Sequence, residues 1–160
     1  MNLRDKRVVQ VIALNPVIGE LFGKAGLTQV ATPTLILAGT ADTLTPALSQ
    51  QLRPFTQLPT PKYLITAIGG THLSVGDPNL NQLLAQSDLV RERQGMAVEP
   101  LRQLVRGVSL AFIQQLTPNA KAYAPFLTPS YAQSLSTPDL PLRLSTNLPL
   151  GLLNLEAALR

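Results

Sequence analysis

Three short apolar runs, each ended by asparagine, proline or glycine, are the feature that most restricts how this chain can fold. The runs are Val8–Leu14, Thr34–Ala38 and Tyr63–Ile68. Each has the length and β-branched content of a strand buried on both faces. The connections between them are long enough to hold helices. The pattern therefore predicts an α/β fold in which three parallel strands follow one another across the sheet and carry helices on their faces.

Two helices are predicted in the connections between these strands. The first lies within Val17–Leu27 and ends near Gly26. The second opens with Thr45 as N-cap and Pro46 at the first helical position, and it ends near Arg53 and Pro54.

The chain after the third strand is predicted to be mostly helical. From Pro100 to Leu116 the apolar residues recur at helical spacing, so Leu104, Val108 and Phe112 are expected to face a core. A shorter helix is expected at Ser130–Leu135, whereas 76–94 is polar and is expected to be a surface excursion. The tail is leucine-rich but interrupted by prolines, and no structure is predicted for it. The expected organisation is a strand and loop segment (1–76), a helical extension (77–136) and the tail (137–160).

The composition excludes several classes of site. The 13 Lys and Arg and the 9 Asp and Glu are scattered, and only 4% of residues are aromatic, so we expect no nucleic-acid partner. The absence of cysteine excludes a disulfide framework, a thiolate metal site and a cysteine nucleophile. A single histidine leaves only carboxylates as further zinc ligands, and no glycine loop typical of phosphate binding is present. We therefore expect neither a metal nor a cofactor.

The hydropathy of the chain predicts a soluble protein without a transmembrane segment. No apolar run approaches the ~18 residues that span a bilayer. The opening residues are polar and charged and lack the apolar centre of a secretory signal. The compartment is left open by the sequence, and any export signal is expected to lie in a missing N-terminal part.

Two residues with catalytic chemistry follow the second and third predicted strands. Asp42 lies in the loop Gly39–Pro46, and His72, the only histidine, follows Gly69–Gly70–Thr71. Taken singly, such residues are commonly a turn aspartate and a surface histidine. The carboxyl ends of adjacent parallel strands meet at one edge of a sheet, which is where ligands bind in open α/β sheets. We therefore predict that Asp42 orients the imidazole of His72 as an acid–base pair.

These segments resemble a known family. Pro33–Asp42, followed by Gly69–Gly70–Thr71–His72, is similar to the acid and histidine segments of serine α/β-hydrolases. Val11–Pro16 resembles the preceding strand, particularly in dienelactone-hydrolase-like and platelet-activating-factor-acetylhydrolase-like members. The resemblance, which covers residues 5–76, implies the C-terminal half of an α/β-hydrolase sheet with three strands and a family-specific extension. It further implies acyl transfer from carboxylic esters or related acyl compounds, with His72 as general base and Asp42 as its partner.

The nucleophile of that family is missing from the sequence. Its serine lies in a GxSxG turn, and no such motif is present. Ser74 is the nearest serine but is poorly placed for a base only two residues away, and Asp77 is an alternative orienting acid that fits a solvated turn better. The serine and the oxyanion hole are therefore expected from an N-terminal half, and the chain alone is expected to be inactive.

A second interpretation stays open. The chain can be a non-enzymatic binding or interaction protein built on a hydrolase-like half-sheet. An uncovered parallel edge is a template for pairing with another strand. The isolated chain is therefore expected to be weakly stable or to self-associate through the open sheet edge.

Overall fold

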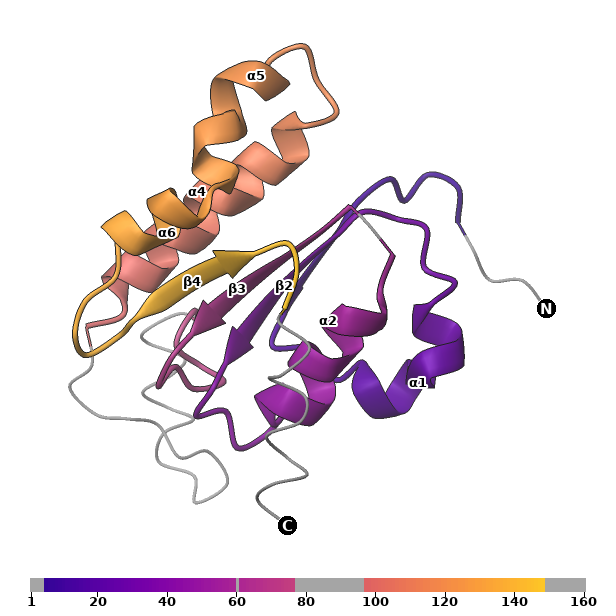
Figure 1. Ribbon diagram of the computed structural model, residues 1–160, viewed down its shortest axis with the longest axis horizontal. Helices are drawn as coiled ribbons and strands as arrows, with labels where there is room; N and C mark the ends of the chain where they lie inside the picture. Colours follow the sequence, from indigo (N-terminus) through magenta and orange to yellow (C-terminus); the bar gives the residue numbers. More distant parts are fainter. Residues whose placement is uncertain (1–4, 60, 77–96, 149–160) are drawn as a thin grey trace.

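The computed structural model describes residues 5–59, 61–76 and 97–148 (Figure 1). Within these ranges the chain forms one four-stranded sheet with the strand order β1-β2-β3-β4. The elements are β1 (Val11–Leu14), α1 (Gly19–Leu27), β2 (Thr34–Gly39), the π-helical turn η1 (Leu48–Leu52), α2 (Arg53–Gln57), β3 (Lys62–Ala67), α4 (Glu99–Gln114), α5 (Ala120–Tyr123), the 3₁₀ turn η2 (Ala124–Leu127), α6 (Pro129–Ser134) and β4 (Leu142–Ser145). The predicted α/β class is confirmed.

The first three strands are parallel and adjacent in chain order, as predicted. Every residue of β2 is buried, because β2 has a strand on each side and helices on each face. In β1, however, Ile12 and Leu14 are exposed. The prediction that this run is buried on both faces is wrong, because the core that α4 and α6 form over β2, β3 and β4 includes no residue of β1. β1 is also an edge strand, with β2 as its only neighbour among the described strands.

The fourth strand corrects the predicted strand count of three. β4 pairs antiparallel with β3, with Ala67 opposite Leu142 and Leu64 opposite Ser145. Leu140, Leu142 and Leu144 are all buried at alternate positions. The prolines at 138 and 141 lie before the strand and not within it, and an edge strand tolerates proline at its start. The alternation of leucines was the signal in the sequence, but the prolines obscured it.

Helices cover both faces of the sheet (Figure 1). On one face α4 and α6 pack against side chains of the sheet, which include Leu35, Leu37 and Ile65 and the buried leucines of β4. On the other face α1, η1 and α2 pack against Ile36 and Leu64. The predicted inward face of α4 is confirmed, since Leu104, Val108 and Phe112 are each 0% exposed.

Phe112 supplies a test of this core. Its ring meets Tyr63 edge-on at a centroid distance of 5.8 Å. We expect Phe112→Ala to lower the free energy of unfolding by ~3–5 kcal/mol, because the lost ring leaves a cavity in a closely packed site. Urea denaturation measures this loss, with Leu110→Ala, at a 46% exposed position of the same helix, as the matched control. Equal losses in the two variants would contradict the packing described here.

The two connecting helices differ from their predicted forms. Gly23 adopts a left-handed φ of 57° and breaks α1 internally. The helix before β3 begins at Ala47 with no side-chain cap, so Thr45 is not its N-cap, and the helix runs past Pro54 to Gln57. Proline has no backbone N–H to donate, and Pro54 lies in the first turn of α2, directly after the π turn.

The remaining predictions for the second half of the chain are met in part. The short helix predicted at Ser130–Leu135 corresponds to α6, and α5 and η2 precede it. Residues 77–94 of the predicted surface excursion lie outside the described residues. None of the helices in the described ranges combines the length and the hydropathy that crossing a bilayer requires.

Candidate active site

The loops after β2 and β3 touch each other through glycines. Ala41 N donates a hydrogen bond to Gly70 O at 2.9 Å, and Thr40 N donates to Ala67 O at 3.0 Å. A Cβ on Gly39 would lie 2.5 Å from Gly70 O, which no side chain allows. The glycines that end the two strands are therefore what lets the Asp42 loop and the His72 loop come together.

Asp42 is buried in its loop, and both carboxylate oxygens are occupied. Oδ1 accepts from the backbone N–H groups of Leu44 at 2.9 Å and Thr45 at 2.8 Å. Oδ2 lies 2.7 Å from the hydroxyl of Thr45. The side chain is 0% exposed. Asp42 is therefore a turn aspartate, as the ordinary interpretation of such a loop suggests. The backbone N–H groups of the turn bind Oδ1 only, so Oδ2 can accept a further hydrogen bond beside that of the Thr45 hydroxyl.

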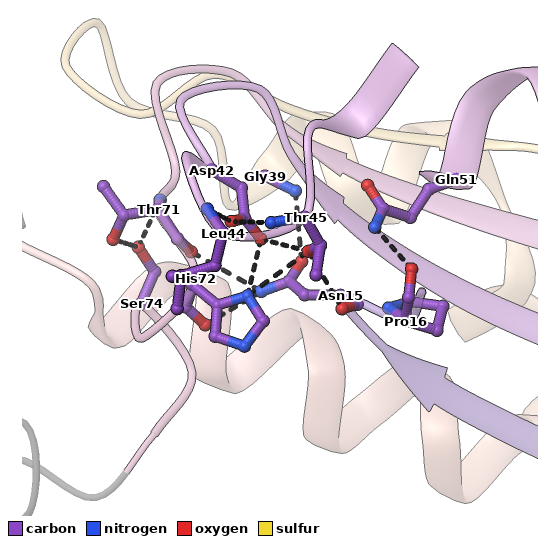
Figure 2. A network of polar contacts seen from close by, with 10 residues as sticks. All are labelled: Asn15, Pro16, Gly39, Asp42, Leu44, Thr45, Gln51, Thr71, His72 and Ser74. Carbon is purple, nitrogen blue, oxygen red and sulfur yellow. Dashed lines mark hydrogen bonds and ion pairs between the residues drawn. The ribbon is translucent and has the colours of Figure 1, made fainter. Parts of the chain in front are cut away.

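The second oxygen of Asp42 meets His72. Nδ1 of the imidazole lies 2.8 Å from Asp42 Oδ2 (Figure 2). The predicted proximity of the two residues is therefore confirmed, and both lie at the carboxyl end of the parallel strands. The His72 side chain is 29% exposed, and its Nε2 has no hydrogen-bond partner among the described residues. The carboxylate thus engages one ring nitrogen and leaves the other free for chemistry.

Two further residues complete the network and were missed as site residues by the sequence analysis. Thr45 Oγ1 lies 2.7 Å from Asp42 Oδ2 and 3.0 Å from Asn15 O, so its one proton can go to either acceptor. Asn15, at the end of β1, donates from Nδ2 to His72 O at 2.9 Å. One signal in the sequence could have identified Asn15: it directly follows a strand, at the carboxyl end of the sheet where the two predicted residues also lie.

Ser74, the alternative serine, has no hydrogen bond to Asp42 or to the imidazole of His72 among the described contacts. Ser74 is buried, and its hydroxyl accepts from Thr71 N at 2.8 Å and lies 2.9 Å from Thr71 Oγ1. Figure 2 shows Ser74 beside Thr71, whereas the ring nitrogen Nδ1 of His72 faces Asp42 and Thr45. Ser74 therefore stabilises the turn that carries His72. Asp77, the alternative acid, lies outside the described residues.

No protein-family model matches the chain, and no curated protein matches it either.

The geometry suits proton transfer at Nε2. A carboxylate bound to Nδ1–H keeps the imidazole in the tautomer whose Nε2 accepts a proton, and it stabilises the imidazolium that forms. The Asp42 carboxylate is held by backbone N–H groups, so it does not have to reorganise when that charge appears. The arrangement has the geometry of a general base held by an orienting carboxylate.

Proposed function

We propose that this chain supplies the acid and the base of a serine hydrolase that acts on carboxylic esters or related acyl compounds. The observation that carries the proposal is the 2.8 Å contact between Asp42 Oδ2 and His72 Nδ1 at the carboxyl end of β2 and β3. The order of these residues along the chain, acid before histidine, and the resemblance of their loops to α/β-hydrolases support the same assignment.

The proposed reaction uses both ring nitrogens of His72. Nε2 takes the proton of a serine hydroxyl as that oxygen forms a bond to the acyl carbon, and Asp42 stabilises the resulting imidazolium. The imidazolium then gives this proton to the departing alcohol oxygen as the ester bond breaks. Water then gives a proton to the same nitrogen as its oxygen bonds to the acyl carbon of the acyl-enzyme. The bond from that carbon to the serine oxygen breaks, the imidazolium returns its proton to the serine oxygen, and the carboxylic acid is released.

The serine and the oxyanion-hole donors belong, in this proposal, to a complementary half that pairs with β1. β1 is an edge strand in the described sheet, and Ile12 and Leu14 are exposed on one of its faces. In an α/β-hydrolase the strand that precedes the serine would pair with the strand equivalent to β1, on the side where β1 has no neighbour in the described sheet. In this proposal the absence of a complementary half explains both the open edge at β1 and the missing serine.

A complementation assay tests the proposal. The full chain is mixed or co-expressed with the N-terminal half of a dienelactone-hydrolase-like enzyme that carries GxSxG and ends before the strand equivalent to β1. We expect p-nitrophenyl acetate hydrolysis by the pair, and no hydrolysis by either half above a His72→Ala background. A fluorophosphonate probe should label the serine only in the pair. Robust hydrolysis by the isolated chain that survives His72→Ala would contradict the assignment of the site.

The exposed apolar residues around β1 favour one alternative, a non-enzymatic interaction protein. Val8, Val9, Ile12, Leu14 and Val17 are all at least 37% exposed. Natural proteins usually block or cover such an edge. This alternative would be favoured if a complementary half bound the chain without producing hydrolysis.

Self-association through the β1 edge is expected of the isolated chain under both functions. We expect Ile12→Lys to weaken it by ~10-fold or more, because like charges would meet across the new strand pair. Sedimentation velocity over a concentration series measures the effect, and Leu110→Lys on α4 is the control at an equally apolar exposed position. A wild-type chain that stays monomeric at all concentrations would show that the edge is covered.

A further inference from the structure

We infer that Asn15 is a positioning residue that sets the orientation of His72 toward Asp42, an inference that rests on the proposed function. All four polar groups of Asn15 are used. Its backbone N–H donates to Leu37 O at 3.1 Å, and its Oδ1 accepts from Gly39 N at 3.2 Å, so two bonds join it to β2. Its Nδ2 donates to His72 O at 2.9 Å, and its backbone oxygen lies 3.0 Å from Thr45 Oγ1.

These contacts make Asn15 the meeting point of three strand ends. Asn15 directly follows β1, accepts a hydrogen bond from Gly39, the last residue of β2, and donates one to the main chain of His72 in the loop after β3 (Figure 2). It also contacts Thr45, whose hydroxyl lies against the same Asp42 oxygen that faces His72. Asn15 therefore couples the histidine loop to the acid loop without a hydrogen bond to the imidazole: its side chain joins His72 O to Gly39 N, and its backbone oxygen accepts from Thr45.

The backbone of Asn15 explains why asparagine suits this position. Its φ is 47°, in the left-handed region, and it is the one non-glycine residue with positive φ in the described part of the chain. Asparagine enters this region more readily than most residues, and its amide offers both a donor and an acceptor. Glycine would fit the backbone but lose the side-chain bonds to Gly39 N and His72 O and the longer one from Nδ2 to Thr71 O at 3.5 Å. Aspartate would keep the acceptor for Gly39 N but place an oxygen against the carbonyl of His72.

The test uses these two substitutions with one control. Asn15→Gly keeps the left-handed backbone accessible and removes the amide, and Asn15→Asp keeps size and acceptor and removes the donor. The control is Gln50→Ala, which removes another buried side-chain amide. Its Oε1 accepts from Gly19 N at 3.2 Å, and Gly19 belongs to α1 and to neither the acid loop nor the histidine loop. Circular dichroism establishes that each variant is folded at the temperature of measurement.

The primary readout is the imidazole of His72, observed by nitrogen-15 NMR of the full isolated chain. His72 is the sole histidine, so its signals need no assignment. In the wild type and in Gln50→Ala we expect the neutral imidazole to occupy one tautomer, protonated at Nδ1, with a downfield Nδ1 proton. In Asn15→Gly and Asn15→Asp we expect that proton signal to be lost and both tautomers to be populated. Retention of the wild-type spectrum in either folded Asn15 variant would overturn the inference.

A second readout separates this inference from the proposed function. In the complemented enzyme both Asn15 variants should lower kcat by ~10²-fold with little change in KM, because a misplaced base affects the chemical step. If complementation yields no hydrolysis but the NMR differences appear, the proposed function fails and the positioning role of Asn15 stands. If hydrolysis appears and the Asn15 variants match the wild type in kcat, the positioning role fails and the proposed function stands.

Discussion

Replacing His72 with alanine is expected to lower the kcat of the complemented hydrolase by ~10⁶-fold, the loss typical of removing the base from a catalytic triad. The reason lies in the network around the ring. Nε2 is the one basic group that the described site offers to a serine hydroxyl, since Asp42 is buried and bound on both oxygens. No neighbouring side chain among the described residues is placed to take over the proton.

The measurement compares kcat for p-nitrophenyl acetate between the complemented wild-type and His72→Ala chains at equal occupancy of the N-terminal half. Pull-down of the tagged half determines the occupancy, which separates loss of the base from loss of pairing. Thr71→Ser, which keeps a hydroxyl near Ser74, serves as a control in the same loop and should retain activity. A His72→Ala enzyme within tenfold of wild type would remove His72 from the mechanism.

Asp42→Asn is expected to lower kcat by ~10⁴-fold in the same assay, with KM little changed. The substituted amide can still accept from the backbone N–H groups of Leu44 and Thr45, so the loop should keep its shape. In place of Oδ2 the new amide nitrogen would present its N–H donors to His72 Nδ1. The imidazole then adopts the opposite tautomer, whose Nε2 carries a proton and cannot act as a base.

Asp77→Asn is the matched control for this prediction, because Asp77 is the other acid close to His72 in the sequence. We expect it to retain activity within about tenfold of wild type, the spread ordinary for a residue outside the catalytic unit. The reverse result, with Asp77→Asn inactive and Asp42→Asn active, would transfer the orienting role to Asp77. The histidine assignment would be unaffected by that exchange.

The acid–histidine pair could be predicted because its position follows from local rules. Each residue comes directly after a strand that proline introduces and glycine ends, and parallel strands place such loops at one edge. The Asn15 role could not be predicted in the same way. An Asn-Pro sequence after a strand suggests only a turn, whereas the bond from Asn15 Nδ2 to His72 O joins residues 57 positions apart.

The sequence by itself determined the α/β class, the order and direction of β1 to β3, the buried face of α4 and the convergence of Asp42 with His72. These features depend on the spacing of apolar residues and of helix and strand breakers, which act over short stretches of chain. Only the tertiary structure decided that Leu142–Ser145 pairs with β3, that β1 is an exposed edge and that Asn15 joins three strand ends. Strand pairing and side-chain hydrogen bonds depend on partners distant in sequence, and a four-residue strand among prolines has too few residues for a local pattern to identify those partners.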